Sequence, residues 1–237
     1  MNLIKRLFST LAGHQLIRTS WREMFFSSLG AFATILVLVV LVRYFSFGMV
    51  FSLPILASMG ASAFLLFVVP HSPMAQPWPV IGGHLLAAVI GVACAQWIAN
   101  PALATAMAVG LSIFAMHGLN CLHPPSSATA MFAVLGGAEV HSLGWQFCYE
   151  VVFINAAIIL LLAFVINNLI PGRRYPLYHS HLAERTQIQP SPPAATAKLT
   201  ETDFQWALGQ MDGLVDVSVE DLVDLVKLAT KHAQSHK

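Results

Sequence analysis

From residue 44 to residue 138 the chain contains no Asp, Glu, Lys or Arg. The only charged residues between Arg43 and Arg173 are Glu139 and Glu150. Over its whole length the chain is 57% hydrophobic and 10% charged, whereas soluble domains carry roughly 25% charged residues. So long an apolar stretch without charge finds its lowest free energy inside a lipid bilayer. The sequence therefore predicts an integral membrane protein whose main partner is lipid.

The apolar runs divide into long and short segments. Long runs can span about 30 Å of hydrocarbon, whereas the two short ones would give helices of roughly 24 and 20 Å. Both short segments follow prolines, which suit the first turn of a helix. We expect an all-α, polytopic fold with four long transmembrane helices and two short membrane helices, either re-entrant or crossing. The long runs cover about residues 24–42, 80–98, 102–119 and 146–170, and the short ones 54–69 and 125–137.

The two halves of this block resemble each other. Each half has a long span, a short proline-started element rich in small residues, and then a His-Ser pair, at His71-Ser72 and His141-Ser142. Pro54 and Pro125, which start the short elements, are 71 positions apart. Paired short hydrophobic segments at corresponding positions indicate the binding site of a transporter. If the short elements cross the membrane the repeats are inverted, and if they turn back the repeats are parallel.

Basic residues flank the block at Arg18 and Arg22 before the first span and at Arg173 and Arg174 after the last. The positive-inside rule then predicts a multi-pass protein of the inner (plasma) membrane with both termini in the cytoplasm. We expect four regions along the chain. They are a basic amphipathic segment (1–22), the transmembrane domain (23–172), a basic flank with a Pro-rich linker (173–200) and a cytoplasmic helical tail (201–237).

The tail is too small to hold a hydrophobic core of its own. Two short helices are predicted, at 201–210 and from Ser218 onward, and the second has one apolar face. We expect this face to pack on another copy of the chain or on a partner, so that a homo-oligomer could form through the tail or the membrane helices.

His123, Pro124 and Pro125 precede the second short element. Pro125 suits a helix start, so the amides of residues 126–128 would lack partners four residues back and would lie at the positive end of the helix dipole. Such amides can bind an anion. A histidine with an ordinary pKa near 6.5 could carry a proton beside that anion. The alternative is that His123 only caps a turn, and that the small hydroxyl residues only permit close helix packing.

The strings CLHPPSSATA and ILASMGASAFLLFVVPHSPMAQPWPVIGGH resemble the HPP family of integral membrane proteins, over about residues 20–172. The resemblance implies a transport function, because some plant and cyanobacterial relatives are associated with nitrite. Many bacterial relatives carry CBS domains behind the membrane part. This chain stops before them, so we expect no nucleotide-sensing module.

These arguments predict a transporter or channel for a small monovalent anion, with nitrite as the leading candidate. The expected substrate-binding residues lie on the two short elements and their flanks: His123, Pro124, Pro125, Ser126, Ser127, Thr129, Ser58, Gly60, Ser62, His71 and His84. The near absence of carboxylates favours anions over cations. No nucleophile–base pair, cofactor motif, resident metal site or nucleic-acid-binding feature is visible, so we expect neither an enzyme nor a cofactor.

Two alternatives to an anion transporter remain open at this point. One is a histidine-based metal ion permease using His71, His84, His117 and His123, because imidazole binds Zn and Cu. The other is a membrane anchor that transports nothing and whose tail binds a partner.

The predicted orientation can be tested with reporter fusions after Arg22 and after Arg174. Both fusions should report the cytoplasm, because basic residues flank the first and last spans. A reporter active only outside the cytoplasm, at either position, would exclude an even number of crossings.

Overall fold

The computed structural model describes residues 20–45, 56–177, 225–228 and 230. Pro54, most of the expected N-terminal segment and most of the expected tail lie outside these residues. The chain divides into two compact units, one of which is Phe25–His179. In the other, residues 225–228 are helical. All helices discussed below belong to the membrane block, residues 20–177.

The predicted helical membrane fold is confirmed. In the described part of the chain, four segments are long and apolar enough to cross a membrane. They are α2 (Trp21–Phe45), α4 (Pro77–Trp97), α5 (Pro101–Gly118), and the continuous run of η2 (Phe147–Phe153), a π-helix, with α8 (Ile154–Leu169). The two short apolar helices are α3 (Ser58–Val68) and α6 (Ser126–Leu135). Two small elements complete the block, η1 (Pro73–Ala75) and α7 (Gly137–Leu143).

Local sequence sets where these helices begin. Pro77 and Pro101 are the first residues of α4 and α5, where a missing N–H leaves no bond unmade. The side chain of Asn100 caps α5 by accepting a hydrogen bond from the amide of Leu103 at 3.0 Å. Gly144 follows α7 with φ of 50°, a backbone conformation that favours glycine. These local signals explain why the predicted helix boundaries lie within a few residues of the observed ones.

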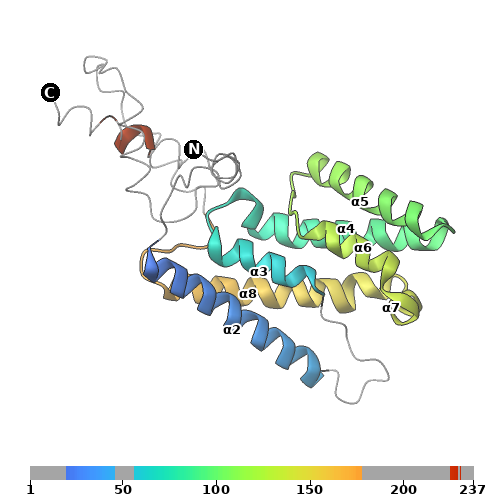
Figure 1. The fold of residues 1–237 in the computed structure, drawn as a ribbon, viewed down its shortest axis with the longest axis horizontal. Coiled ribbons are helices and arrows are strands. Elements are labelled where there is room, and N and C mark those ends of the chain that lie inside the picture. The colour runs from blue at the N-terminus through green and yellow to red at the C-terminus, as the bar shows by residue number, and fades with distance from the viewer. Residues whose placement is uncertain (1–19, 46–55, 178–224, 229, 231–237) are drawn as a thin grey trace, which may run out of the picture. The chain divides into compact units, whose positions relative to one another are not determined.

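Consecutive helices alternate in direction along the block (Figure 1). Since α2 and α4 run the same way, the chain returns between them, and α3 runs in the return direction (Figure 1). The short helix α6 does the same between α5 and α8 (Figure 1). Each short helix therefore runs antiparallel to the long helices before and after it. The first half, α2–α3–α4, runs opposite to the second half, α5–α6–α8, so the repeats are inverted.

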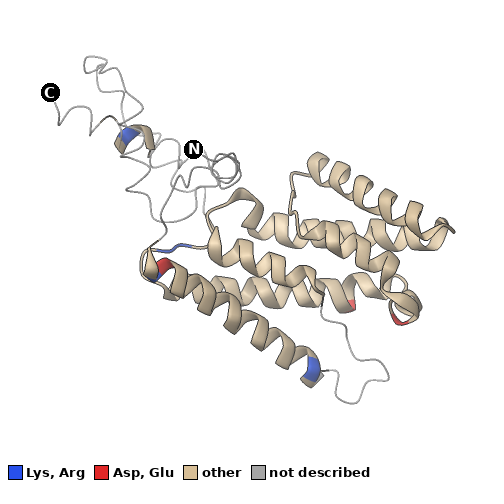
Figure 2. Ribbon diagram, in the orientation of Figure 1, with Lys and Arg blue, Asp and Glu red and all other residues tan. Residues whose placement is uncertain are grey.

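Both ends of the block lie on one side. Arg173, just after α8, donates a hydrogen bond from Nη2 to Ser27 Oγ near the start of α2, at 2.6 Å. The Nη1 of the same guanidinium donates to Asn167 Oδ1 at 3.0 Å, and Asn167 Nδ2 donates to the carbonyl oxygen of Leu66 on α3. Charged residues occur towards the ends of the helical block and not in its middle (Figure 2). This is the distribution that a membrane interior requires.

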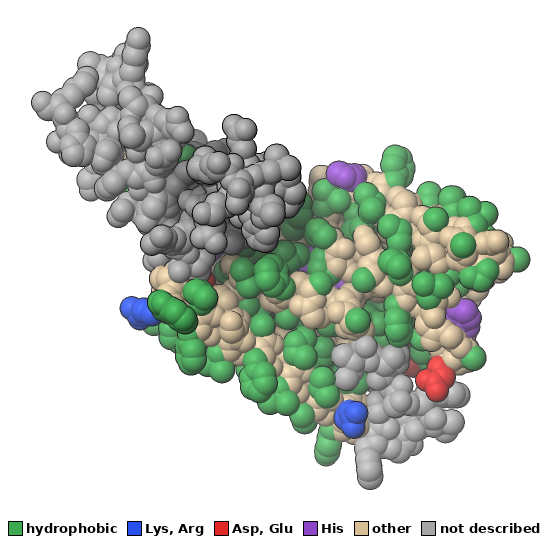
Figure 3. Space-filling model, viewed as in Figure 1, with side chains coloured by type: hydrophobic (Ala, Val, Ile, Leu, Met, Phe, Trp, Pro, Cys, Tyr) green, Lys and Arg blue, Asp and Glu red, His purple; other side chains and the backbone are tan. Residues whose placement is uncertain are grey.

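Hydrophobic side chains dominate the outside of the block as well as its core. Phe114 on α5 is 78% exposed and Leu169 on α8 is 75% exposed, and Figure 3 shows green side chains spread over the visible face. In water such a surface would be unfavourable, whereas in a bilayer it meets lipid. Cys94, Cys121 and Cys148 are free and buried, as expected for core residues.

Helices α4 and α6 approach each other closely at Gly91. A β-carbon on Gly91 would lie 2.7 Å from Ala133 Cβ and 2.8 Å from the carbonyl oxygen of Ala130. Backbone atoms cannot move aside without separating the helices. Small residues therefore set the distance between α4 and α6, as is common for helix pairs in membranes.

We expect Gly91→Ala to destabilise the protein by about 1–3 kcal/mol, because overpacking forces the two helices apart. Gly110→Ala is the matched control, since a β-carbon on Gly110 in α5 would meet nothing within 4 Å. That variant should be neutral or slightly stabilising. Thermal unfolding of the two purified variants in detergent measures the difference, and equal midpoints would contradict the close α4–α6 contact.

Candidate functional site

Five polar side chains from four different segments meet inside the block. Ser58 and Ser62 come from α3, His84 from the first half of α4, His123 from the turn before α6, and Thr129 from α6 itself. All five are buried, and four of them have no solvent exposure at all. We call this group the His–Ser–Thr cluster. It joins the first and second halves of the chain at the level of the two short helices.

Ser62 lies between the two histidines. Its hydroxyl oxygen is 2.9 Å from His84 Nε2 and 2.8 Å from His123 Nε2, and the two imidazole centroids are 5.0 Å apart in an edge-to-face arrangement. On the far side of His84, Nδ1 lies 2.8 Å from Thr129 Oγ1. Thr129 Oγ1 in turn lies 2.9 Å from Ser58 Oγ. The side chains thus form one continuous chain of hydrogen bonds.

The contact at His123 Nδ1 fixes which atoms donate and which accept along the hydrogen bonds of the cluster. His123 Nδ1 is 2.8 Å from the carbonyl oxygen of Met74, which can only accept, so Nδ1 carries a hydrogen. In a neutral His123, Nε2 then accepts from the Ser62 hydroxyl. Ser62 can accept only from His84 Nε2–H, and His84 Nδ1 accepts from Thr129, which accepts from Ser58. With both histidines neutral, every donor in the cluster points from Ser58 towards Met74.

The cluster lies in an uncharged environment. No Asp, Glu, Lys or Arg occurs in α3, η1, α4 or α6. The described residues contain no group of three or more His, Cys, Asp or Glu side chains that could hold a metal ion. Only two of the four histidines proposed for a metal permease belong to the cluster, and His117 on α5 is exposed. The five side chains of the cluster are linked to one another by hydrogen bonds.

A clasp formed by residues on both sides of η1 holds the Met74 carbonyl in place. Gln76 Nε2 donates to the carbonyl oxygens of Pro70 and Ser72, at 3.0 and 2.9 Å. The Tyr175 hydroxyl, from the segment after α8, donates to the carbonyl oxygen of Ala75 at 2.8 Å. Burial raises the pKa of Tyr175, so the phenol stays a donor. The sequence analysis missed this clasp, because Tyr175 is 100 positions away from Ala75.

The amides at the start of α6 have partners, contrary to the sequence prediction. The amides of Ser126, Ser127 and Ala128 donate to the carbonyl oxygens of residues 123, 124 and 125, at 2.9–3.1 Å. The His-Pro-Pro segment forms a tight turn whose carbonyls lie three residues back, so the expected row of free donors does not exist. At the start of α3 the amides of Met59 and Gly60 are bonded in the same way.

The remaining predicted site residues lie around the cluster or away from it. The side chain of Ser126 is fully buried, and its hydroxyl has no hydrogen-bond partner among the described residues. Gly60 and Pro124 are exposed, and Ser127 and His71 are half-buried. None of these four contributes a side-chain hydrogen bond to the cluster in the described structure. Pro125 is buried and supports the turn.

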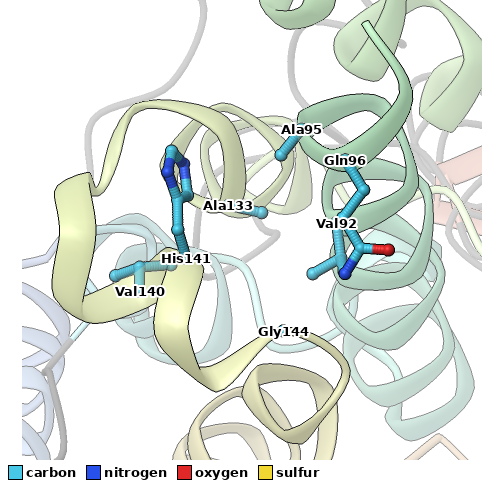
Figure 4. Close-up of a pocket in the computed structure, with 7 residues that line it drawn as sticks. All are labelled: Val92, Ala95, Gln96, Ala133, Val140, His141 and Gly144. Atoms are coloured by element: carbon cyan, nitrogen blue, oxygen red, sulfur yellow. The ribbon is translucent and has the colours of Figure 1, made fainter.

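A cavity of about 120 Å³ opens near the other end of α4, between α4, α6 and α7 (Figure 4). Its polar side chains are those of Gln96 and His141, and both residues are exposed. His141 Nε2 donates to the carbonyl oxygen of Val134. We take the cluster rather than this cavity as the candidate site, because the cluster concentrates buried polar groups. The cavity is lined by Val92, Ala95, Gln96, Ala133, Val140, His141 and Gly144.

Four helices long and apolar enough to cross a membrane, with two short apolar helices packed among them in oppositely running halves, define a polytopic integral membrane protein. The chain belongs to the HPP family, because residues 17–176 match the family model described as the HPP transmembrane region. The resemblance inferred from the two sequence strings is thus confirmed.

Two curated relatives are transmembrane proteins of Dictyostelium discoideum. One is 44% identical over 128 residues, which cover 52% of this chain and 45% of the relative. The other is 35% identical over 166 residues, which cover 68% of this chain and 53% of the relative. The chain spans about half the length of these relatives. No solved structure matches it.

Removing the central hydroxyl should destabilise the block. In Ser62→Ala, His84 Nε2 and His123 Nε2 lose their common partner, and each buried unsatisfied group costs about 1–3 kcal/mol. Ser142→Ala is the matched control, because the Ser142 hydroxyl is exposed and bonds only to the Glu139 carbonyl oxygen nearby. It should change stability by less than about 0.5 kcal/mol. Thermal unfolding in detergent compares them, and an unchanged midpoint for Ser62→Ala would contradict the bridging role.

Proposed function

We propose that this protein transports a small monovalent anion across its membrane, with nitrite as the leading candidate. The observation that carries the proposal is the fully buried His–Ser–Thr cluster at the junction of two inverted halves. In transporters built from inverted repeats, substrate sites lie near the middle of the membrane, at the interface between the repeats. The identity of nitrite comes from the family resemblance alone.

The chemistry of the cluster supports an anion. Hydroxyl and imidazole groups offer O–H and N–H donors, and no carboxylate stands near them to repel a negative charge. No Lys or Arg is present either, and a fixed cation would hold a small anion too tightly for quick release. Neutral donors give a weak, reversible site, which transport requires. The Ser126 hydroxyl, which has no partner among the described residues, would donate to the anion, whereas the helix-start amides are already bonded.

The other functions have less support. A metal permease would need more than two converging imidazoles or an acidic partner. A pure anchor would not require a chain of five buried polar side chains, since small and apolar residues suffice to pack helices in a bilayer. Ser62 and His123 lie within hydrogen-bonding distance, as a nucleophile and a base would, but both side chains are fully buried, so we propose transport and not catalysis.

The proposed location is the inner (plasma) membrane, with both termini in the cytoplasm. The hydrogen bond that joins Arg173 to Ser27 supports this proposal because it brings the two ends of the block together, and the basic residues there favour the cytoplasmic side. The η1 clasp would then face the cytoplasm, because Tyr175 of the C-terminal flank belongs to it.

His123→Ala is the direct test of the proposal. The variant loses the imidazole that joins Ser62 to Met74, and one charge-assisted hydrogen bond is worth about 1.5–3 kcal/mol. Nitrite uptake by the purified protein in proteoliposomes should therefore fall about tenfold or more. Uptake into protein-free vesicles must be subtracted, because neutral nitrous acid crosses lipid unaided.

The matched control is His117→Ala, since His117 lies exposed on α5. It should leave uptake within about twofold of the wild type. Size-exclusion profiles confirm that both variants are folded. Wild-type uptake rates in a folded His123→Ala protein would assign the cluster to packing alone.

A further inference from the structure

Ser62 has more hydrogen-bonding neighbours than it can satisfy in the neutral cluster. Its hydroxyl has one hydrogen and two lone pairs. Three groups lie in range: His84 Nε2, His123 Nε2 and the carbonyl oxygen of Ser58, the last at 3.1 Å. With both histidines neutral, Ser62 donates to His123, accepts from His84, and leaves the Ser58 carbonyl without its hydroxyl bond. The heavy atoms are thus placed for one more hydrogen bond than the neutral cluster contains.

One added proton allows all three contacts of Ser62 to become hydrogen bonds. When His123 is protonated, Nε2–H donates to Ser62 Oγ, and Nδ1–H still donates to Met74. The Ser62 hydroxyl then turns to the Ser58 carbonyl oxygen and accepts from both histidines. Every contact in the cluster becomes a hydrogen bond, and only the hydroxyl hydrogen has moved. The geometry therefore contains a position for a proton on His123 Nε2.

A proton alone would be costly there, and so would an anion alone. The elements packed against His123 are α3, α4, α6 and η1, and they carry no Asp, Glu, Lys or Arg. Among the described groups, the titratable side chain facing His123 is His84, and Cys121 lies beyond Gly82 and Gly83. An isolated charge in a low-dielectric interior is strongly disfavoured. A proton and a monovalent anion bound together sum to zero charge.

We infer that the cluster binds one proton together with each anion, so that the protein is an electroneutral proton–anion symporter. This inference rests on the proposed transport function. The proton comes from water on the side where the anion enters and forms the N–H bond at His123 Nε2. It returns to water when the anion leaves on the other side. Neither ion is consumed.

The buried Ser126 hydroxyl supplies a donor for the anion. A β-carbon on Gly83 would lie 2.9 Å from Ser126 Oγ and 3.0 Å from His123 Cβ, so both residues border the same face of α4. Ser126 Oγ has no partner among the described residues, and a buried hydroxyl without a partner is unfavourable. An anion beside His123 would accept from the Ser126 hydroxyl, while the two N–H groups of a protonated His123 stay bonded to Ser62 and Met74. Ser126→Ala should weaken nitrite uptake without changing its response to pH.

The test separates the pH gradient from the membrane potential. Proteoliposomes with the full chain receive external nitrite, and valinomycin with equal potassium on both sides holds the potential at zero. After subtraction of the protein-free vesicles, an acidic exterior should raise the initial rate of nitrite uptake, because one proton accompanies each anion. A potassium diffusion potential without a pH gradient should have no effect. His123→Gln, which keeps hydrogen-bonding groups but does not titrate, should lose the response to pH.

The possible outcomes are distinct. Protein-dependent uptake that follows the potential and ignores the pH gradient overturns the coupling but keeps the transport function. An unchanged pH response in His123→Gln overturns the role of His123. No protein-dependent uptake of nitrite, under any gradient, removes the proposed function for this anion and the coupling with it.

Discussion

A buried polar group in this protein must find its partner inside the protein, because the uncharged block offers neither water nor counter-ions. The bridge from His84 through Ser62 to His123 meets that requirement. It ties α3, α4 and the His-Pro-Pro turn together, and Met74 extends it to η1. The positions of both short helices depend on this bridge, since neither is long enough to be held by lipid contact alone. Packing then follows, with Gly91 permitting α6 to lie against α4.

The inverted repeat explains why the polar groups meet. Ser58 and Thr129 are 71 positions apart and are hydrogen-bonded to each other. Residues at equivalent positions of two repeats can touch only near the axis that relates the repeats, so this pair marks the axis. The same offset pairs His84 of α4 with Asn155 of α8. Asn155 Nδ2 bonds within its own helix, to the Val151 carbonyl oxygen. At these equivalent positions the two halves therefore differ, since α4 carries a titratable imidazole and α8 carries an amide.

Most of the fold was predictable, because apolar run length, prolines and missing charges act locally. The sequence also identified the residues of the cluster, Ser58, Ser62, His84, His123 and Thr129, from their types and the repeat. It could not show that the amides after Pro125 bond three residues back, which depends on the turn geometry. The sequence also could not show that Ser62 belongs to the cluster and Gly60 does not, since the orientation of the helix decides which small residue faces inward. The clasp from Tyr175 to η1 needed the tertiary structure, because no local pattern joins such distant segments.

The surroundings of the cluster differ on its two sides. Towards the chain ends, η1 covers the cluster through the Met74 carbonyl, whose donor is His123 itself. Towards the cavity, Gly91 and Ala133 are in close contact, and Val92 on the cavity wall lies eight residues from His84, or about 12 Å along the helix. An imidazolium donates a stronger hydrogen bond than a neutral ring. In the symport proposed above, a proton on His123 would therefore strengthen the hydrogen bond to η1, whereas the apolar contact at Gly91 is insensitive to charge. The two sides of the cluster would thus respond differently to the proton.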